Sequence, residues 1–271
     1  AKQYQFCFVL PNSFKSALIP WLANIPLRIG YRGELRYGLI NLALNNPSKT
    51  NRPPMAQHYL ALADVVANMA NDDPSRSTDL AHQPQLQIQA NAQKRVEQKL
   101  QDKTINPATT YILCPGAEYG PTKRWPTEHF AALTNAILDQ DSNHNVILLG
   151  GPGDKSLASQ IIQLCKTSDR LHDWCGTCSL DESIALIGLC KAVVSNDSGL
   201  MHIAAALRTP QVAIFGSSDP AHTPPLSENA KVIWLNLPCS PCHKKECPLG
   251  HLKCLKDILP QQVFATLNTL L

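Results

Sequence analysis

One stretch constrains the fold of this chain more than any other: a short apolar run, a polar break and an alanine-rich helix pattern follow one another over residues 193–207. The run at Val193–Ser195 is typical of a buried parallel strand, and the break is Asn196–Gly199. A second apolar run at residues 212–215 follows the helix pattern. Strand, helix and strand in this order predict a βαβ unit, whose crossover is nearly always right-handed.

The polar break lies where sheets of this kind bind ligands, outside the carboxyl ends of the strands. Asp197 or Ser198 can cap the following helix, and Gly199 lets a ligand approach the backbone closely. The free N–H groups of the first helical turn attract an anion. Because a carboxylate repels phosphate, the functional role that suits Asp197 is to accept hydrogen bonds from sugar hydroxyls beside a phosphate. A capping aspartate in an ordinary βα turn explains the local pattern equally well.

The second half of the chain alternates strands and helices and predicts an α/β fold with a doubly wound parallel sheet. Its expected strands are residues 110–114, 146–149, 193–195 and 212–215, and its expected helices are residues 127–139, 155–165, 180–190 and 200–207. Low apolar content through residues 101–109 marks the expected domain boundary. The chain is therefore predicted to form one domain of residues 1–105 and another of residues 106–271.

Two further loops of this second half follow predicted strands. Residues 115–126 are rich in glycine and proline and present Lys123 just before a helix, as suits a diphosphate. The loop matches neither the P-loop nor the dinucleotide-binding fingerprint. Asp154 follows a glycine turn at the next strand end, where it can hold ribose hydroxyls or simply cap a helix.

The first half is less regular. The pattern predicts a strand at residues 6–10, a helix at 14–23, a loop at 29–37, a helix at 58–69, a polar loop at 71–85, a short strand at 86–88 and a charged surface helix at 90–100. The loop at residues 29–37, named the arginine loop, contains Arg32 and Arg36, and Arg28 lies just before it. Such a group can grip an anionic substrate or form a solvated face, and the residues alone leave both readings open.

Length and composition exclude several classes of protein. The 271 residues suffice for two ordinary domains, and the 44% that are apolar provide a core. No window approaches the roughly 18 apolar residues of a membrane span. A net charge of +3 is too small to indicate nucleic acid as a partner. We expect the ten cysteines to be reduced thiols in a cytosol, because no export signal precedes the first strand-like run.

Two groups of cysteines have suggestive spacing. Cys175 and Cys178 have thioredoxin-like spacing but no preceding buried strand, so we expect no redox chemistry from them. The second group, Cys239, Cys242, Cys247 and Cys254, has enough ligands for a structural zinc site. Its spacing matches no standard finger or ferredoxin, and a metal, two disulfides or free thiols all remain open.

Residues 196–206, Asn-Asp-Ser-Gly-Leu-Met-His-Ile-Ala-Ala-Ala, resemble the signature of the ADP-heptose:lipopolysaccharide heptosyltransferases, glycosyltransferase family 9. Further matches at residues 10–18, 31–39, 114–126 and 215–218 extend the resemblance over nearly the whole chain. The family implies a GT-B architecture, with two Rossmann-like domains across a cleft and the nucleotide-sugar on the C-terminal one. That expectation agrees with the α/β pattern of residues 106–271.

The resemblance also implies roles for individual residues. Lys123 would neutralise the donor diphosphate and Asp197 would bind donor hydroxyls, which makes these two the expected catalytic residues. The other expected donor-binding residues are Gly116, Ala117, Asp154, Ser198, Gly199, Leu200, Met201 and His202. His202 is expected to pack or hydrogen bond, and not to act as an acid or base. Lys15, Arg32 and Arg36 would face the anionic lipopolysaccharide core.

The implied activity is inverting transfer of L-glycero-D-manno-heptose from ADP-heptose to a heptose of the lipopolysaccharide inner core. It would take place in the cytosol, in peripheral contact with the inner membrane, and its chemistry would require no cofactor. The family begins with a strand and a loop that supply the proposed catalytic base, and this chain starts downstream of them. We therefore expect an N-terminally truncated, incomplete first domain and a chain that binds ADP without transferring heptose. The alternatives are a different nucleotide-sugar donor and a zinc-binding interaction module built on the cysteines.

Overall fold

The computed structural model describes residues 3–48, 52–69, 83–166 and 169–271. The chain divides into two compact units, Ala1–His82 and Gln83–Leu271. The predicted boundary at residues 105 and 106 therefore lies too late in the chain. Helix α3 (Ala90–Asp102) was assigned to the first domain, but it packs on helix α6 (Leu180–Leu189) of the second unit. This contact buries Ala92, Val96 and Leu100 there.

The second unit is built on six parallel strands, which pair in the order β6-β5-β4-β7-β8-β9. The strands are β4 (Thr110–Cys114), β5 (Asn145–Leu148), β6 (Leu171–Asp173), β7 (Ala192–Asn196), β8 (Gln211–Ile214) and β9 (Ala230–Ile233). The chain moves outward from β4 to β6, then returns to the other side of β4 and moves outward again to β9. This is the order of the doubly wound fold, and its topological switch point lies between β4 and β7.

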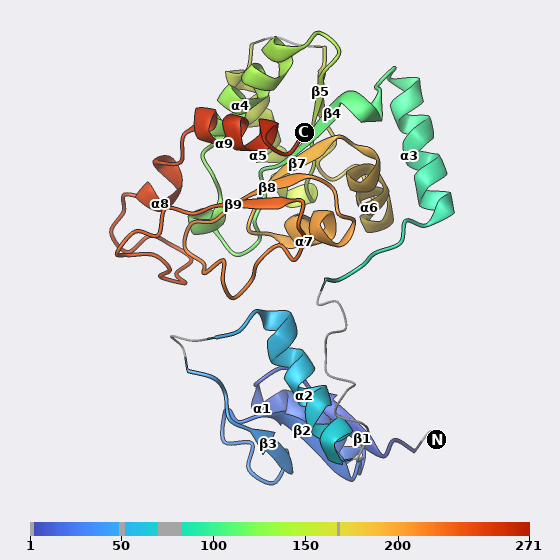
Figure 1. The fold of residues 1–271 in the computed structure, drawn as a ribbon, viewed down its shortest axis with the longest axis vertical. Helices are drawn as coiled ribbons and strands as arrows, with labels where there is room; N and C mark the ends of the chain where they lie inside the picture. The colour runs from blue at the N-terminus through green and yellow to red at the C-terminus, as the bar shows by residue number, and fades with distance from the viewer. Residues whose placement is uncertain (1–2, 49–51, 70–82, 167–168) are drawn as a thin grey trace. The chain divides into compact units, whose positions relative to one another are not determined.

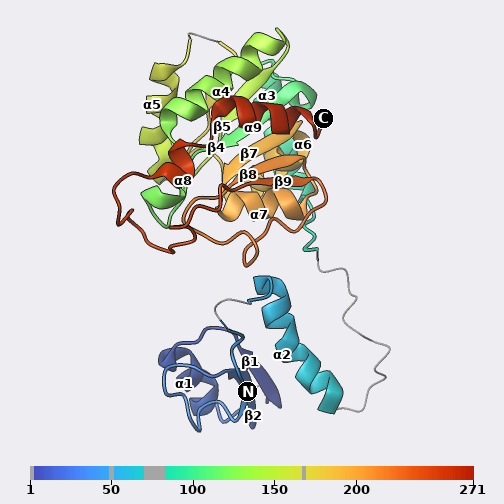
Figure 2. The ribbon, with the colours of Figure 1, turned by 60° about the vertical axis from the view of Figure 1, so that its left-hand side comes forward.

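Helices cover both faces of this sheet, as Figure 1 shows. One face carries α4 (Thr127–Gln140), α5 (Lys155–Leu164), α8 (Lys253–Lys256) and α9 (Pro260–Asn268), and the other carries α3, α6 and α7 (Gly199–Ala206). Alternate residues of β4 point to opposite faces, so that Tyr111 and Leu113 join the first core while Ile112 and Cys114 join the second. Figure 2 shows α4, α5 and α9 side by side on their face. The predicted doubly wound α/β fold of this unit is confirmed.

The first unit contains a three-stranded parallel sheet in the order β1-β2-β3. Its elements are β1 (Phe6–Val9), α1 (Phe14–Leu22), β2 (Leu27–Tyr31), β3 (Leu42–Leu44) and α2 (Met55–Met69). Ser13 caps α1 by accepting a hydrogen bond from the Ser16 N–H, in agreement with the predicted helix start. Two small clusters form its core: Val9, Ala17 and Ile40 in one, and Ile29, Tyr31 and Leu62 in the other.

Several local predictions are corrected. Residues 29–31, predicted as the start of the arginine loop, belong to strand β2 instead, and Arg28 lies within the same strand. Residues 86–88 form no strand, and the Leu86 N–H instead donates to the Ala206 carbonyl. Most of the predicted loop at residues 71–85 lies outside the described residues. None of the helices in the described ranges has the length and apolar character needed to cross a bilayer.

Candidate active site

The loops that follow β4, β5, β7 and β8 meet at one edge of the second sheet. The strands are parallel and in register there, with Cys114 beside Ser195 and Asn196 beside Ile214. Residues that follow each strand are thus brought together although they are far apart in the chain. This edge at the switch point is where an open α/β sheet binds its ligand.

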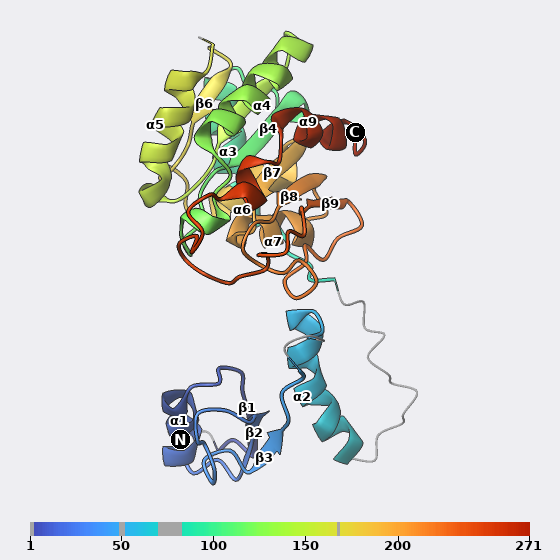
Figure 3. The same cartoon turned by 90° about the vertical axis from the view of Figure 1, so that its left-hand side faces the viewer.

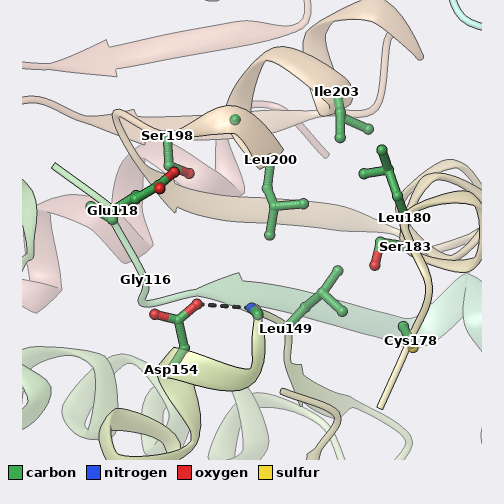
Figure 4. Close-up of a pocket in the computed structure, with 14 residues that line it drawn as sticks. Gly116, Glu118, Leu149, Asp154, Cys178, Leu180, Ser183, Ser198, Leu200 and Ile203 are labelled. Carbon is green, nitrogen blue, oxygen red and sulfur yellow. Dashed lines mark hydrogen bonds between the residues drawn. The ribbon is translucent and has the colours of Figure 1, made fainter. Parts of the chain in front are cut away.

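A pocket of about 350 Å³ opens at this edge, within the size range of small-molecule sites. Figure 4 shows the apolar side chains of Leu149, Leu200 and Ile203 gathered on one side of it. The carboxylates of Glu118 and Asp154 lie on the other side. An apolar slot with polar groups at one rim suits a planar base attached to a hydroxylated sugar.

Six of the predicted donor-binding residues line this one pocket: Gly116, Ala117, Asp154, Ser198, Gly199 and Leu200. Ser198 is the N-cap residue of α7, and its side chain makes no capping hydrogen bond. The first-turn N–H groups of α7 thus have no side-chain acceptor from the cap, and Gly199 and Leu200 at this helix end line the pocket. A helix end of this kind attracts an anion such as a phosphate.

Asp154 takes a fixed position between two strand ends. Its Oδ2 accepts a hydrogen bond of 2.9 Å from the Gly151 N–H, which Figure 4 marks with a dashed line. A Cβ on Gly116 would lie 2.3 Å from the same oxygen, and a Cβ on Gly150 would lie 2.6 Å from it. Both glycines are therefore required for the Asp154 carboxylate to lie at the pocket rim.

Asn196 is fully buried and connects the loops after β4 and β7. Its Nδ2 donates to the Pro115 carbonyl at 2.8 Å, and its Oδ1 accepts from the Trp125 N–H at 3.0 Å. The loop that carries Lys123 lies between these two anchoring points. Asn196 belongs to the sequence stretch that predicted the site, but its function as a connector between loops was not predicted.

Lys123 and Asp197, the two predicted catalytic residues, form an ion pair. The Lys123 Nζ lies 2.5 Å from Asp197 Oδ2, and the Ser218 hydroxyl donates to that same oxygen at 2.5 Å. Asp197 is buried, whereas the Lys123 side chain is about one-fifth exposed. Ser218 follows β8 and was not predicted as a site residue. Its sequence signals were its place after an apolar strand and the family match at residues 215–218.

A second, smaller pocket of about 140 Å³ lies beside this ion pair. It is lined by Lys123, by hydroxyl groups and by two imidazoles, with the lining residues Tyr119, Lys123, Ser217, Ser218, Asp219, His222, Thr223 and His243. The Lys123 ammonium also lies over the Tyr119 ring, 5.4 Å from its centroid. The hydroxyl, imidazole and ammonium groups around this pocket suit a hydroxylated or anionic group.

The remaining two predicted donor residues have different surroundings. Met201 is fully buried against Ala213 and Phe215, so its side chain belongs to the core and only its backbone faces the helix end. His202 is exposed. Desolvation lowers the pKa of His202, the charge of Asp197 raises it, and that of Lys123 lowers it further. His202 therefore titrates within the field of the ion pair.

The predicted acceptor residues lie in the first unit. Lys15 and Arg32 are exposed, near the carboxyl ends of β1 and β2. Arg36 is buried, and its guanidinium donates to the Pro11 carbonyl at 2.6 Å, to Asn12 Oδ1 at 3.0 Å and to the Tyr31 carbonyl. Burial lowers the pKa of Arg36, and the neighbouring Glu34 opposes that change. In this structure Arg36 holds its loop together.

The paired thiols of the thioredoxin-like motif are poorly suited to redox chemistry. Burial raises the pKa of Cys175 to about 12, with a further contribution from Asp173, and burial also raises the pKa of Cys178. A thiol of this kind is protonated at neutral pH and is a poor nucleophile. Cys178 instead contributes part of the wall of the first pocket.

The family model for glycosyltransferase family 9 (heptosyltransferase) matches residues 1–253. The chain belongs to glycosyltransferase family 9. The two parallel α/β units agree with the predicted GT-B architecture, which this membership confirms. The chain is thus a glycosyltransferase, as predicted.

Individual relatives agree with this family 9 assignment. The lipopolysaccharide heptosyltransferase 2 of Escherichia coli is 40% identical over 100% of this chain and 76% of its own length. The lipooligosaccharide heptosyltransferase 2 of Haemophilus ducreyi is 40% identical over 99% of this chain and 77% of its own. The solved E. coli ADP-heptose heptosyltransferase II superposes with a TM-score of 0.77 at 38% identity, and covers 98% of this chain and 76% of that one. Within the family, the sequence motifs are most like those of heptosyltransferase II, and these comparisons confirm that likeness.

Proposed function

We propose that this protein transfers L-glycero-D-manno-heptose from ADP-heptose to a heptose of the lipopolysaccharide inner core, with inversion at the anomeric carbon. Membership of family 9 and the likeness to heptosyltransferases 2 support heptose transfer in core synthesis. The single observation that carries the donor assignment is the apolar pocket that ends at the N-terminus of α7, next to the Lys123–Asp197 pair.

Ser198 in the turn between β7 and α7 lines the first pocket, and Lys123 and Ser218, which contact Asp197 in the same turn, line the second. This arrangement gives the donor a direction. The apolar first pocket receives the adenine, and Asp154 at its rim accepts hydrogen bonds from the ribose hydroxyls. The diphosphate then crosses the first turn of α7, where backbone N–H groups and the helix dipole stabilise its charge. The sugar lies toward the second pocket, with its hydroxyl and imidazole groups, and toward the ion pair.

The two side chains of the ion pair have different roles: Lys123 binds the diphosphate and Asp197 binds the sugar. A lysine ammonium has three N–H donors, and the contact with Asp197 uses one of them, so two remain for phosphate oxygens. As the glycosidic bond to ADP breaks, negative charge grows on the leaving diphosphate. Lys123, already oriented by Asp197, stabilises that charge without reorganisation. The contacts of Lys123 and Ser218 with the Asp197 carboxylate both use Oδ2, and the other oxygen is the one that a sugar hydroxyl would reach.

The acceptor is anionic, and the exposed Lys15 and Arg32 are the residues of the first unit that we assign to it. By likeness to the lipopolysaccharide heptosyltransferases, we place the reaction at the cytosolic face of the inner membrane. No cofactor is invoked for the displacement itself.

Titration of ADP and of UDP by calorimetry tests the donor assignment. Lys123→Ala should weaken ADP binding by about 1.5–3 kcal/mol, roughly 10- to 150-fold, the range for hydrogen bonds to a charged group. The matched control is Lys166→Ala, which removes an exposed lysine that pairs with Asp139 elsewhere on the unit. Tighter binding of UDP than of ADP, or an unchanged affinity in Lys123→Ala, would overturn the assignment.

Asp197→Asn separates the two roles of the pair. We expect it to reduce heptose transfer to a deheptosylated acceptor more than it reduces ADP binding, because its proposed partners are sugar hydroxyls. An equal loss of both would indicate that the substitution has only disturbed the turn before α7.

A further inference from the structure

The cysteine segment, residues 234–254, comprises the long irregular stretch between β9 and α8 and the first two residues of α8, and its trace is visible in Figure 3. It contains four of the ten cysteines. A stretch of this length with little regular structure of its own needs some other constraint to hold one conformation. Disulfides do not supply it in this structure, where all four cysteines are free thiols.

The four cysteine side chains line one small cavity. Cys239, Cys242, Cys247 and Cys254 all contribute to it, together with Thr122 and Ser217. Its volume is about 20 Å³, and a cavity needs roughly 10–15 Å³ to hold one water molecule. The space therefore suits a single atom or ion, and its walls combine the four cysteines with Pro248, Leu249, His251 and Leu252.

The chain around this cavity is positively charged: the segment and α8 carry Lys244, Lys245, Lys253 and Lys256 against one acid, Glu246. This positive charge complements four thiolates around one divalent cation, which together carry a charge of −2.

In the described ranges, no three histidine, cysteine or acidic side chains already stand in a ligating arrangement. The four sulfurs share a cavity, however, and a change of χ1 rotamer re-aims a cysteine sulfur without moving the backbone. Ligand closure around the ion would thus require side-chain rotation within the segment.

We propose that these four cysteines bind one soft divalent cation of the zinc class as a closed, structural tetrathiolate site. On binding, each of the four thiols loses its proton to solvent and forms one metal–sulfur bond, with no change of oxidation state. With four protein ligands there is no open position for substrate, so the site is structural and takes no part in the transfer chemistry.

The site would hold one wall of the second pocket. The Thr122 hydroxyl donates to the Lys244 carbonyl at 2.5 Å, and the His243 N–H donates to the Ser217 carbonyl at 2.8 Å. The Tyr119 hydroxyl donates to the His243 carbonyl at 2.8 Å. The cysteine segment is thereby fastened to the loop that presents Lys123. The effect on the donor, unlike the metal site itself, rests on the proposed function.

Metal analysis of the purified protein and cobalt(II) substitution test the site. We expect about one metal per chain, a thiolate-to-cobalt absorption band of a tetrahedral centre, and release of about four protons per cation bound. Serine at any of the four cysteine positions should abolish the tetrahedral spectrum. Cys165→Ser, a half-buried thiol outside the segment, is the matched control and should leave it unchanged. Retention of the spectrum in Cys254→Ser with its loss in His251→Ala would overturn the four-thiolate assignment.

Two further readings separate this proposal from the proposed function. Removal of the metal should speed tryptic cleavage at Lys244 and Lys245 at least tenfold, whether or not a donor is present. Absence of bound metal, or a thiol count that reveals disulfides among the four positions, would refute the site even if ADP binds normally. Metal binding with protection of the segment, but without any ADP binding, would leave the site intact and refute the donor assignment instead.

Discussion

The two units of this chain hold their charged residues in place by different means. In the second unit, a six-stranded sheet is buried on both faces, and side chains such as Phe130, Ile147 and Leu186 are fully buried between it and its helices. In the first unit, a three-stranded sheet has two small apolar clusters, and the large side chains of Phe14 and Trp21 are exposed. Apolar packing therefore positions the donor loops of the second unit.

The arginine loop of the first unit depends instead on polar contacts. The buried guanidinium of Arg36 holds the loops after β1 and β2 through backbone carbonyls and Asn12. The difference indicates how each surface responds to change. A substitution at the donor edge acts through packing against a rigid sheet, whereas one in the arginine loop acts through loss of hydrogen bonds.

The largest effect should follow from Arg36→Ala. It removes the guanidinium donors to the Tyr31 carbonyl and to Asn12 Oδ1, and leaves the Pro11 carbonyl with the Ser16 hydroxyl as its donor. Hydrogen bonds to a charged group contribute about 1.5–3 kcal/mol each. We expect about 3 kcal/mol less protection in hydrogen exchange for peptides within residues 3–48, and none lost within residues 83–166. Arg32→Ala, which removes an exposed arginine of the same loop, should change exchange by less than about 0.5 kcal/mol. Equal effects of the two substitutions would remove the distinction between the units.

Gly116→Ala should have the next largest effect, through packing. The added Cβ would lie 2.3 Å from Asp154 Oδ2, and an overpacked site typically costs about 1–3 kcal/mol. We expect a loss of stability in this range, measured by urea unfolding without ligand, and about 30-fold weaker ADP binding, which corresponds to about 2 kcal/mol.

A double-mutant cycle isolates that contact. Adding Asp154→Ala to Gly116→Ala should recover most of the lost stability, because the clash disappears with the carboxylate. Gly153→Ala is the matched glycine control, since a Cβ there meets no atom within 4 Å. Strictly additive effects of the two substitutions would show that the clash is not the cause.

How far the sequence predicts this fold depends on the position of each strand in its sheet. The central strands β4, β5, β7 and β8 are continuous apolar runs, because helices cover them on both faces, and all four were predicted. The edge strands β6 and β9 were not predicted. They include polar residues such as His172, Asp173 and Lys231, as is common where a sheet edge meets solvent.

The erroneous strand at residues 86–88 has a related explanation. Ile88 is apolar because it packs against the second core, next to Gly188 of α6, and not because it pairs with a strand. Periodicity alone cannot distinguish these two uses of a short apolar run.

The candidate site was predictable as a set of loops but not as a set of contacts. Gly116, Asp154 and Ser198 each lie a few residues after a predicted strand. Because these strands pair in parallel, their carboxyl ends bring the three residues to one pocket. The pairing of Lys123 with Asp197 joins residues 74 positions apart. The contribution of Ser218 depends on side-chain directions that no local pattern encodes. The burial of Arg36 was missed for the same reason.

The smallest expected effect concerns Glu182, which joins α3 to α6 within the second unit. Its Oε2 accepts a hydrogen bond from the Ser179 N–H at 2.9 Å, and its carboxylate lies 3.1 Å from both Arg95 and Lys99. The Ser179 N–H is the main cause that lowers the pKa of Glu182 to about 2, with Lys99 and Arg95 adding to it. A carboxyl whose pKa is lowered on folding stabilises the protein fully above its ordinary pKa of 4.5, and that contribution is lost as the pH falls toward 2.

Glu182→Gln should therefore reduce the free energy of unfolding by about 1 kcal/mol at pH 7, the usual value of a capping contact. The partly exposed arginine and lysine add little to this figure because solvent screens them. Urea unfolding from pH 7 to pH 3 should show the difference between variant and wild type shrinking below about pH 4.5. Asp139→Asn, which breaks the exposed pair with Lys166, should change stability by less than about 0.5 kcal/mol throughout. A difference for Glu182→Gln that stays constant down to pH 3 would show that its charge contributes nothing, and that only the shape of the side chain holds α3 on the second unit.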